Sequence, residues 1–412
     1  MDFKLRSDAD AIVNASIRAV QPDEAVKRAL SQHEFPGRIF LVAAGKAAWQ
    51  MTKTAHGLLG DRIDSGVVIT KYDHVKSPIE NIVCLEAGHP VPDENSFAAT
   101  QKALELVSNL HADDTVLFLL SGGGSALFEK PLIPGSELQD ITNQLLACGA
   151  DIVEINTVRK RLSAVKGGKF ALCCKPAQVF SIVLSDILGD PLDMIASGPA
   201  CADSTTCAQA IEIVQKYNLQ LSDGAMHLLQ QETPKALENV TTHITGSVRQ
   251  LAVAAADACR TLGYEPVVLT DQLSCQAREA GSFLASILKS HAVGGKKLAF
   301  IAGGETVVHL TGKGKGGRNQ ELALSAALGI RDLKGAAVFS IGSDGTDGPT
   351  DAAGGYVDYE TANTLSAKGI DIYNILQEND AYHALQACDG LIFTGPTGTN
   401  VNDVAVALLN IP

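Results

Sequence analysis

Short apolar runs rich in β-branched residues alternate with stretches of helical character along most of this 412-residue chain. Strands that alternate with helices favour a largely parallel sheet with helices on both faces. We therefore predict an α/β fold. The predicted strands are 39–44, 66–70, 82–85, 115–120 and 179–184 in the first half, and 266–269, 298–302, 306–310, 336–341 and 390–394 in the second.

Two features of the chain indicate a division into two domains. Residues 5–33 have apolar side chains at helical spacing, and Pro22 with its following acids predicts that a second helix begins there. Further along, residues 231–246 are polar and interrupt the strand–helix rhythm at Pro234. The length suits two domains. We predict an N-terminal domain at 1–240 and a smaller C-terminal domain at 241–412.

The composition excludes several classes of protein. A net charge of −13 disfavours a nucleic-acid partner, because phosphate backbones would be repelled. The chain has no apolar run near the ~20 residues of a membrane span and no signal-peptide core at its start, so we expect no membrane partner and a cytoplasmic location. Its nine cysteines lack CxxC pairs and are expected to be reduced. A homodimer is left open.

Two glycine-rich loops follow predicted strands of the first half. Ligands of open α/β sheets gather beyond the carboxyl ends of strands. Gly45-Lys46 follows strand 39–44 and places a lysine where backbone amides favour an anion, although a surface lysine would give the same pattern. After strand 115–120, backbone amides can form an anion-binding nest, although a tight turn is the alternative. The nest residues are Ser121, Gly122, Gly123, Gly124 and Ser125.

Charged residues of the first half add further candidates. Arg159-Lys160-Arg161 is a basic cluster that would focus a small anion or be a solvated surface. Arg159 and Lys166 are seven residues apart, which places them on roughly one helical face. Asp186 and Asp190 follow strand 179–184 and can bind magnesium or accept an alcohol proton. At least one of these two aspartates is expected to have an ordinary turn or capping role.

The second half has three loops with polar candidates. Glu305 and the glycine-rich segment 312–317 flank predicted strand 306–310, and Arg318 is expected to begin a helix, where it can bind a carboxylate or a phosphate. Asp344 and Asp347 follow strand 336–341 at a spacing that does not fit a calcium hand. Asn400 lies in the loop after the last predicted strand and is expected near a ligand.

The chain resembles the glycerate 2-kinase family, the class of glycerate kinases whose C-terminal half is called the MOFRL domain. The resemblance covers nearly the full length. It is carried by these segments, in order: Ala44-Gly45-Lys46-Ala47, Gly88-His89-Pro90-Val91-Pro92-Asp93, the loop 121–125, Val158-Arg159-Lys160 with Lys166-Gly167-Gly168, Leu184-Ser185-Asp186, Gly303-Gly304-Glu305-Thr306, Gly317-Arg318-Asn319-Gln320-Glu321, Gly345-Thr346-Asp347-Gly348 and Gly398-Thr399-Asn400-Val401-Asn402-Asp403.

The resemblance implies phosphorylation of D-glycerate at its 2-hydroxyl, with ATP as co-substrate and Mg²⁺ as cofactor. It also implies a Rossmann-like N-terminal domain and a smaller α/β C-terminal domain with a cleft between them. Lys46 and Arg318 would occupy the family's main catalytic positions. The expected remaining site comprises the loop 121–125 and Lys166 for phosphate, Asp186 and Asp190 for the metal, and Arg159, Glu305, Asp344, Asp347 and Asn400 in substrate-binding or supporting roles.

Two alternatives use the same loops differently. Segment 312–317 satisfies GxGxxG, which is typical of a nicotinamide-dependent reductase, here of hydroxypyruvate. However, no acidic residue clearly ends a second strand about twenty residues later to hold the ribose. A non-catalytic sensor of phosphorylated metabolites would use the same anion-binding loops. It would not require so many acidic residues beside them. No GxxxxGK[ST] segment is present, so a Walker-type nucleotide site is not expected.

Overall fold

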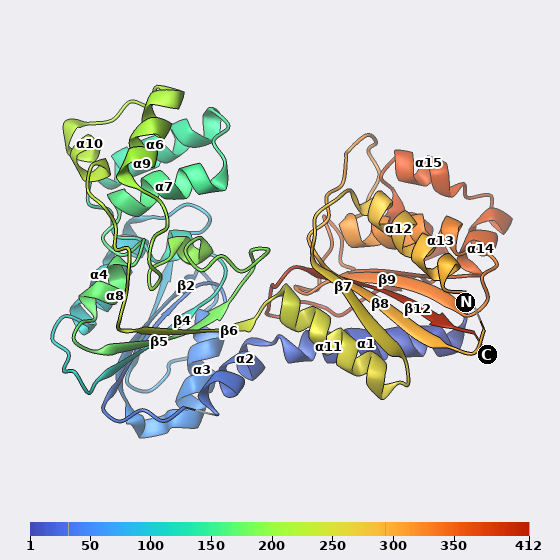
Figure 1. The fold of residues 1–412 in the computed structure, drawn as a ribbon, viewed down its shortest axis with the longest axis horizontal. Helices are drawn as coiled ribbons and strands as arrows, with labels where there is room; N and C mark the ends of the chain where they lie inside the picture. The colour runs from blue at the N-terminus through green and yellow to red at the C-terminus, as the bar shows by residue number, and fades with distance from the viewer. Residues whose placement is uncertain (32, 293, 412) are drawn as a thin grey trace. The chain divides into compact units, whose positions relative to one another are not determined.

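The computed structural model describes residues 1–31, 33–292 and 294–411 (Figure 1). Internal contacts divide the chain into two units, each with its own sheet. The N-terminal unit is Ala25–Thr245, and the C-terminal unit combines Met1–Glu24 with Gly246–Pro412. Residues 1–24 join the C-terminal unit because helix α1 (Phe3–Ala19) packs against α11 (Val248–Thr261). The division into domains at residue 240 stays a prediction.

The sheet of the N-terminal unit has the strand order β3-β2-β1-β4-β5-β6. Strands β3 to β5 of this order pair in parallel. The chain winds outward from β1 in one direction to β3 and then returns to β4 on the other side of β1. The carboxyl ends of β1 and β4 therefore flank the topological switch point, where α/β folds bind ligands. The strands are β1 (Ile39–Ala44), β2 (Ile63–Lys71), β3 (Ile82–Ala87), β4 (Thr115–Leu120), β5 (Gln178–Leu184) and β6 (Val240–Gly246).

Helices cover both faces of this sheet. Alternate residues of β1 belong to two different cores, with Val42 on one face and Leu41 on the other, as expected for a strand buried on both sides. A separate helical group, α6, α7, α9 and α10, has its own apolar core (Figure 1). The helices are α2 (Pro22–Leu30), α3 (Ala48–Leu59), α4 (Glu94–Leu106), α5 (Gly124–Leu127), α6 (Gly135–Ala147), α7 (Ile152–Leu162), α8 (Lys169–Cys173), α9 (Cys207–Tyr217) and α10 (Asp223–Leu229).

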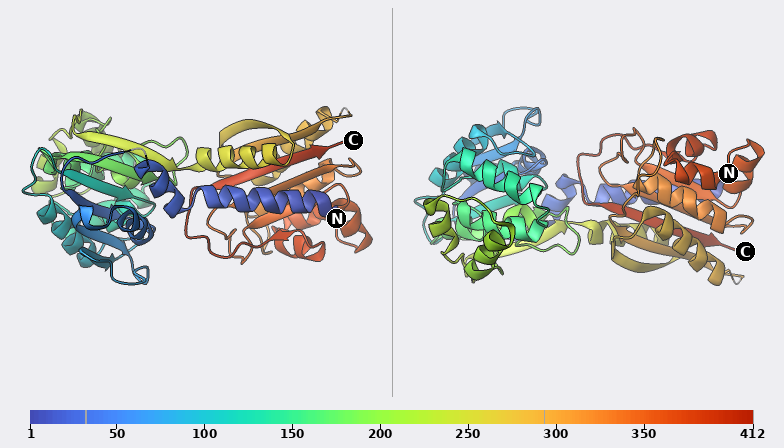
Figure 2. Two further views of the ribbon diagram at one scale, coloured as in Figure 1. Left: turned by 90° about the horizontal axis from the view of Figure 1, so that it is seen from below. Right: turned by 90° about the horizontal axis from the view of Figure 1, so that it is seen from above.

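The sheet of the C-terminal unit has the order β11-β10-β9-β12-β8-β7 and is mixed. Among the described strands of this sheet only β7 and β8 pair in parallel. Strand β12 is antiparallel to β8 and β9, and β10 is antiparallel to β9 and β11. Helices α1 and α11 cover one face, and α12 and α13 the other (Figure 2). The strands are β7 (Glu265–Leu273), β8 (Lys297–Gly304), β9 (Ala336–Gly342), β10 (Gly354–Asp358), β11 (Leu391–Ile392) and β12 (Asp403–Asn410); the remaining helices are α12 (Ala277–Ser290), α13 (Arg318–Gly329), α14 (Thr361–Ala367), α15 (Ile372–Gln377) and α16 (Ala381–Ala387).

The structure confirms the α/β prediction, and β1 and β4 have the predicted bounds. The predicted strand at 306–310 is wrong. That segment is a loop with a single bridge at Val307; Val307 and Leu310 are exposed, Leu310 by 79%, and only Val308 packs partly against the core. Strands β6, β10 and β12 were not predicted. No helix in the described part of the chain is long and apolar enough to cross a membrane.

Candidate active site

The loops that follow β1 and β4 are bonded to each other at the switch point. The Lys46 amide donates to the Gly122 carbonyl at 2.9 Å, and the Ala47 amide donates to Ser121 Oγ at 3.1 Å. Gly45 has a φ of +127°, and a Cβ there would lie 2.2 Å from Ser121 Oγ. Only glycine permits this close approach. The Lys46 side chain is exposed and forms no ion pair with a described residue.

The triple-glycine loop offers backbone donors. The amides of Gly122, Gly123 and Ser125 donate to no acceptor in the described part of the chain. A Cβ on Gly122 would lie 2.4 Å from Asp186 Oδ2, so the loop after β5 is in direct contact with the loop after β4. Unpaired amides beside an unpaired lysine form a site that favours an anion.

A buried ionic group supports the end of this loop. Lys166 Nζ donates to the Ser125 and Phe128 carbonyls at 2.8 and 3.1 Å and lies 3.4 Å from Glu129 Oε2. Arg159 Nη2 lies 3.3 Å from both the Ser125 carbonyl and Glu129 Oε2. Burial lowers the pKa of Lys166 to about 8. In this geometry both cations contact the protein's own oxygens behind the loop.

The predicted geometry of Arg159 and Lys166 was wrong although the two side chains do meet. Helix α7 ends at Leu162, so Lys166 lies beyond it and the two residues do not share a helical face. They converge because the chain turns back toward Ser125 after the helix. Whether either residue contacts a ligand stays a prediction.

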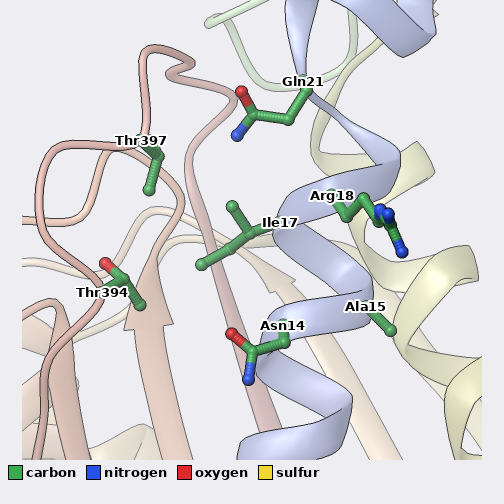
Figure 3. A pocket seen from close by; sticks show the side chains of 7 residues that line it. All are labelled: Asn14, Ala15, Ile17, Arg18, Gln21, Thr394 and Thr397. Atoms are coloured by element: carbon green, nitrogen blue, oxygen red, sulfur yellow. The ribbon is translucent and has the colours of Figure 1, made fainter.

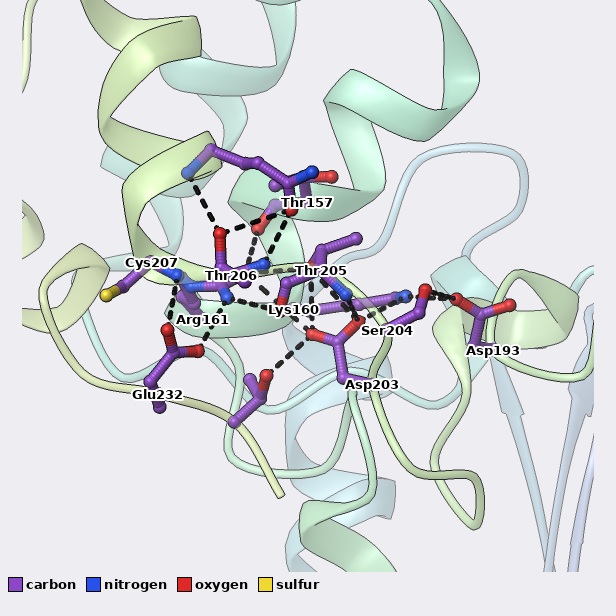
Figure 4. Close-up of polar contacts among 12 residues, drawn as sticks. Thr157, Lys160, Arg161, Asp193, Asp203, Ser204, Thr205, Thr206, Cys207 and Glu232 are labelled. Atoms are coloured by element: carbon purple, nitrogen blue, oxygen red, sulfur yellow. Dashed lines mark hydrogen bonds and ion pairs between the residues drawn. The ribbon is translucent and has the colours of Figure 1, made fainter. Parts of the chain in front are cut away.

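The other two cations of the basic cluster are neither solvated nor open to an anion (Figure 4). Lys160 and Arg161 are fully buried; Lys160 pairs with Asp203 at 2.9 Å and with Asp193 at 3.3 Å. Arg161 donates to Thr205 and to Glu232. These contacts fix the segment after β5 against α7.

The two candidate metal-binding aspartates lie in the loop after β5. Asp186 contacts Gly122, whereas Asp190 has a φ of +52° and a buried Oδ1 without a hydrogen-bond partner in the described chain. Carboxylate oxygens fit Mg²⁺, which usually takes one or two of them together with water and phosphate oxygens. The described residues contain no group of three or more His, Cys, Asp or Glu side chains that would form a complete protein cage.

The C-terminal unit places Arg318 between two carboxylates. Arg318 begins α13, as predicted, and binds Asp403 through Nε at 2.5 Å and Nη2 at 3.0 Å. Its Nη1 donates to Glu305 Oε1 at 2.7 Å, while Glu305 Oε2 accepts from Asn402. Burial works against the charge, but the contacts with Asp403 and Glu305 outweigh it and raise the pKa of Arg318 above its usual value. The Arg318 side chain is one-third exposed.

Asp347 occupies the first turn of α13. Its carboxylate accepts from the Asn319 and Gln320 amides at 3.1 and 2.8 Å. Burial is the main cause that raises the pKa of Asp347 to about 6. Asp344 and Asn400 bond within their own loops, to the Thr346 and Asn402 amides. A ligand role for these three residues stays a prediction.

A cavity of about 550 Å³ lies elsewhere in the C-terminal unit, between α1 and the loop after β11 (Figure 3). Its lining contains no predicted site residue, and Arg18 is its one charged side chain. The arrangement has no converging charges and does not favour an anion site. The cavity is lined by Asn14, Ala15, Ile17, Arg18, Gln21, Thr394 and Thr397.

His89 was missed as a candidate site residue. The sequence singles out its motif, Gly88 to Asp93, but gives no role to the histidine. In the structure the ring edge lies against Gly123, where a Cβ would be 3.1 Å from Nε2. The available signal was its position directly after a strand of the same parallel sheet.

Comparison with known proteins shows the family to which this chain belongs. Residues 8–230 match the model of a domain of unknown function, DUF4147, and residues 298–403 match the MOFRL family. The chain is 52% identical over 411 residues to a D-glycerate 2-kinase of Thermotoga maritima, with 98% of each chain covered. It is 39% identical to a glycerate 2-kinase of Pyrococcus horikoshii, covering 97% of this chain and 96% of the relative.

The chain is also similar to a solved structure and to a relative with a different name. A crystal structure of glycerate kinase from Thermotoga maritima is 51% identical, covers 99% of this chain and 100% of that chain, and has a TM-score of 0.94. A protein of Agrobacterium vitis named putative hydroxypyruvate reductase is 38% identical, with 99% of this chain and 95% of the relative covered. With near-complete coverage at these identities, the chain belongs to the glycerate 2-kinase family.

Proposed function

We propose that this chain transfers the γ-phosphoryl group of ATP to the 2-hydroxyl of D-glycerate and releases 2-phosphoglycerate and ADP. The single observation that carries the proposal lies at the switch point of the N-terminal sheet, where Lys46 has no ion pair and three neighbouring loop amides have no acceptor among the described residues. That arrangement suits a phosphate. The similarity to proteins named D-glycerate 2-kinase and glycerate kinase supports the choice of acceptor.

Each part of the proposed site has a physical role. Phosphoryl transfer requires positioning and stabilisation of charge more than covalent chemistry. The amides of the triple-glycine loop orient phosphate oxygens, and Lys46 neutralises charge that grows on the transferring group. Arg318 contributes either to the same charge or to the carboxylate of the acceptor; its rigid bidentate hold by Asp403 suits both roles.

Mg²⁺ is part of the proposal. When bound, the ion neutralises phosphate charge and aligns the phosphates. Asp186 is the better candidate to hold it, because its carboxylate touches the loop that would bind phosphate. Asp190 supplies a second oxygen ligand for the ion or, alternatively, only stabilises its own turn. Asp186 could also orient the hydroxyl of the acceptor.

Reduction of hydroxypyruvate is the second candidate, favoured by the name of the Agrobacterium vitis relative. The structure offers little support for a dinucleotide site. Segment 312–317 follows a loop instead of a strand, so its GxGxxG pattern lacks the required strand-to-helix context. In the N-terminal sheet β2 ends at Lys71, where a nicotinamide site would have an acidic residue for the ribose.

Phosphorus NMR tests the proposal directly. We would incubate the chain with ATP, D-glycerate and Mg²⁺, omit each in turn, and follow NADH oxidation by hydroxypyruvate in a parallel reaction. A 2-phosphoglycerate resonance that requires all three components is the expected result. NADH consumption without phosphoryl transfer would instead establish the reductase. The cytoplasmic location and the oligomeric state stay predictions.

A further inference from the structure

His89 lies in a loop near the switch point, and the end of this loop is held by hydrogen bonds. The loop joins β3 to α4, and Asp93 at its far end caps the helix by accepting from the Ser96 amide at 2.9 Å. The same carboxylate accepts the Tyr72 hydroxyl at 2.6 Å. These bonds fix both the end of the loop and its contact with the segment after β2. The loop that carries His89 is therefore held at its C-terminal end.

The imidazole and Lys46 flank the same glycine. A Cβ on Gly123 would lie 3.0 Å from Cδ2 and 3.1 Å from Nε2 of His89, and 3.3 Å from Cγ of Lys46. The Gly123 amide is one of those without an acceptor in the described part of the chain. Nε2 of His89 and the side chain of Lys46 therefore both border Gly123, whose amide is one of the loop donors.

His89 itself has no hydrogen bond or ion pair with any residue that the structure describes. The titratable groups that face it are Lys46 from the loop after β1, Lys71 at the end of β2 and His74 from the loop after β2. Burial and then these basic groups lower the pKa of His89 below its usual value. Asp93 does not offset this lowering of the His89 pKa, since its carboxylate binds Tyr72 and Ser96 instead of His89.

A histidine with a purely structural role usually has a hydrogen-bond partner, and His89 has none among the described residues. A general base would be poorly served by two neighbouring lysines, because their charges oppose uptake of a proton. The same lysines favour an anion beside the ring, and a phosphoryl oxygen accepts well from Nε2–H. The surroundings of His89 therefore favour a ring that donates a hydrogen bond to an anion.

We propose that His89 binds an oxygen of the substrate's phosphoryl group through Nε2, together with Lys46 and the amides of the triple-glycine loop. The inference deepens the proposed function and depends on it for the identity of the phosphoryl donor. A direct contact makes His89 a catalytic residue that the motif-based reading of the sequence overlooked.

Histidine NMR of the full-length chain tests the contact apart from catalysis. The chain has ten histidines, and the spectrum of His89→Gln identifies the resonance of His89. Inorganic phosphate, ADP and D-glycerate are added separately while the pH is varied. We expect phosphate and ADP to raise the pKa of His89 by about one unit or more, since a nearby anion favours the charged ring. D-Glycerate alone, which carries only a carboxylate, is expected to have a smaller effect.

Kinetics of matched variants provides the second readout. His89→Ala is expected to lose about 10- to 100-fold in kcat/KM for the phosphoryl donor, the range of one charge-assisted hydrogen bond. His89→Gln retains a donor near the position of Nε2 and is expected to recover part of that loss, whereas His89→Asn does not reach it. His111→Gln, an exposed histidine before the amino end of β4, is the control for general effects of the substitution.

The outcomes separate this inference from the proposed function. If wild-type protein phosphorylates D-glycerate but His89→Ala matches it and phosphate leaves the His89 resonance unchanged, the inference is overturned and the function stands. A response to D-glycerate without one to phosphate would also overturn it, in favour of a carboxylate contact. If phosphate shifts His89 in a wild-type protein that transfers no phosphoryl group, the phosphate contact stands and the assigned reaction fails.

Discussion

The two units present their candidate cations in opposite ways. In the N-terminal unit Lys46 is exposed without an ion pair in the described chain, and it sits beside amides that also lack acceptors. In the C-terminal unit Arg318 is held by Asp403 and Glu305, and the first turn of α13 is already filled by Asp347. An anion can bind at Lys46 without breaking an ion pair. At Arg318 it must share or replace one, so we propose Lys46 for the primary phosphate contact.

Removal of the unpaired cation should have the largest effect. Lys46→Ala is expected to reduce kcat/KM by about 10³-fold, or about 4 kcal/mol of transition-state stabilisation, because the charge that would neutralise the transferring phosphoryl group is removed. Lys53→Ala, an exposed lysine on α3, is the matched control and should remain near wild type. Steady-state kinetics of both variants measures the difference. A Lys46→Ala enzyme within a few-fold of wild type would remove the basis of the comparison.

The paired cation should be sensitive to shape as well as charge. Arg318→Lys keeps the charge but cannot bind Asp403 bidentately and reach Glu305 at once. We expect a loss of about 10²-fold in kcat/KM, or about 3 kcal/mol, measured with the same assay. If the lysine variant retained full activity, a simple positive charge would suffice at this position and the carboxylate frame would have no catalytic importance.

A pair of glycine substitutions tests whether the N-terminal site depends on close backbone packing. Gly45 and Gly149 both have positive φ, but a Cβ on Gly45 overlaps Ser121 while one on Gly149 meets nothing within 4 Å. Gly149→Ala should cost about 1 kcal/mol of unfolding free energy from backbone strain alone. Gly45→Ala should cost about 3 kcal/mol, because overpacking adds to the strain. Urea unfolding of the two variants gives the comparison, and equal costs would contradict it.

The carboxylate at α13 should show itself in the pH dependence of stability. The folded-state pKa of Asp347 is about 6, above the usual 3.8, so its contribution to stability is present below pH 4 and is lost as the pH rises through 6. Asp347→Asn removes this loss. Relative to wild type, the variant should gain up to about 3 kcal/mol between pH 4 and pH 7, since the pKa shift is about 2 units.

Thermal unfolding of Asp347→Asn and wild type at several pH values measures this trend. The pH dependence of all other groups cancels in the difference between the two proteins if they keep the same fold. A difference that is flat with pH, or that moves in the opposite direction, would mean that Asp347 is ionised normally in the folded chain.

The parts of the fold that the sequence predicted are those with a local signal. Strands β1 and β4 are compact apolar runs bounded by polar residues and glycine, and their bounds were predicted correctly. The segment 306–310 has a similar apolar pattern, but it forms no strand and leaves Val307 and Leu310 exposed, because both edges of β8 already pair with β12 and β7. β12 comes from the end of the chain, and no local pattern shows that it lies between β8 and β9.

In the candidate site, too, features with a local sequence signal were predicted, and contacts between distant residues were not. The sequence places Lys46 and the glycine loops at strand ends, and the structure brings those loops together. It could not show that Lys160 and Arg161 are buried, because their partner Asp203 lies about forty residues away in a separate loop. The position of His89 beside Gly123 likewise depends on the order of strands in the sheet.

A crystal structure of the full-length chain with a non-hydrolysable ATP analogue, Mg²⁺ and D-glycerate is the most direct test of the assigned phosphate site. The account predicts γ-phosphate oxygens within hydrogen-bond distance, about 3 Å, of Lys46 Nζ and the Gly122 and Gly123 amides. A γ-phosphate bound by Arg318 alone, with Lys46 and the triple-glycine loop still free, would contradict it.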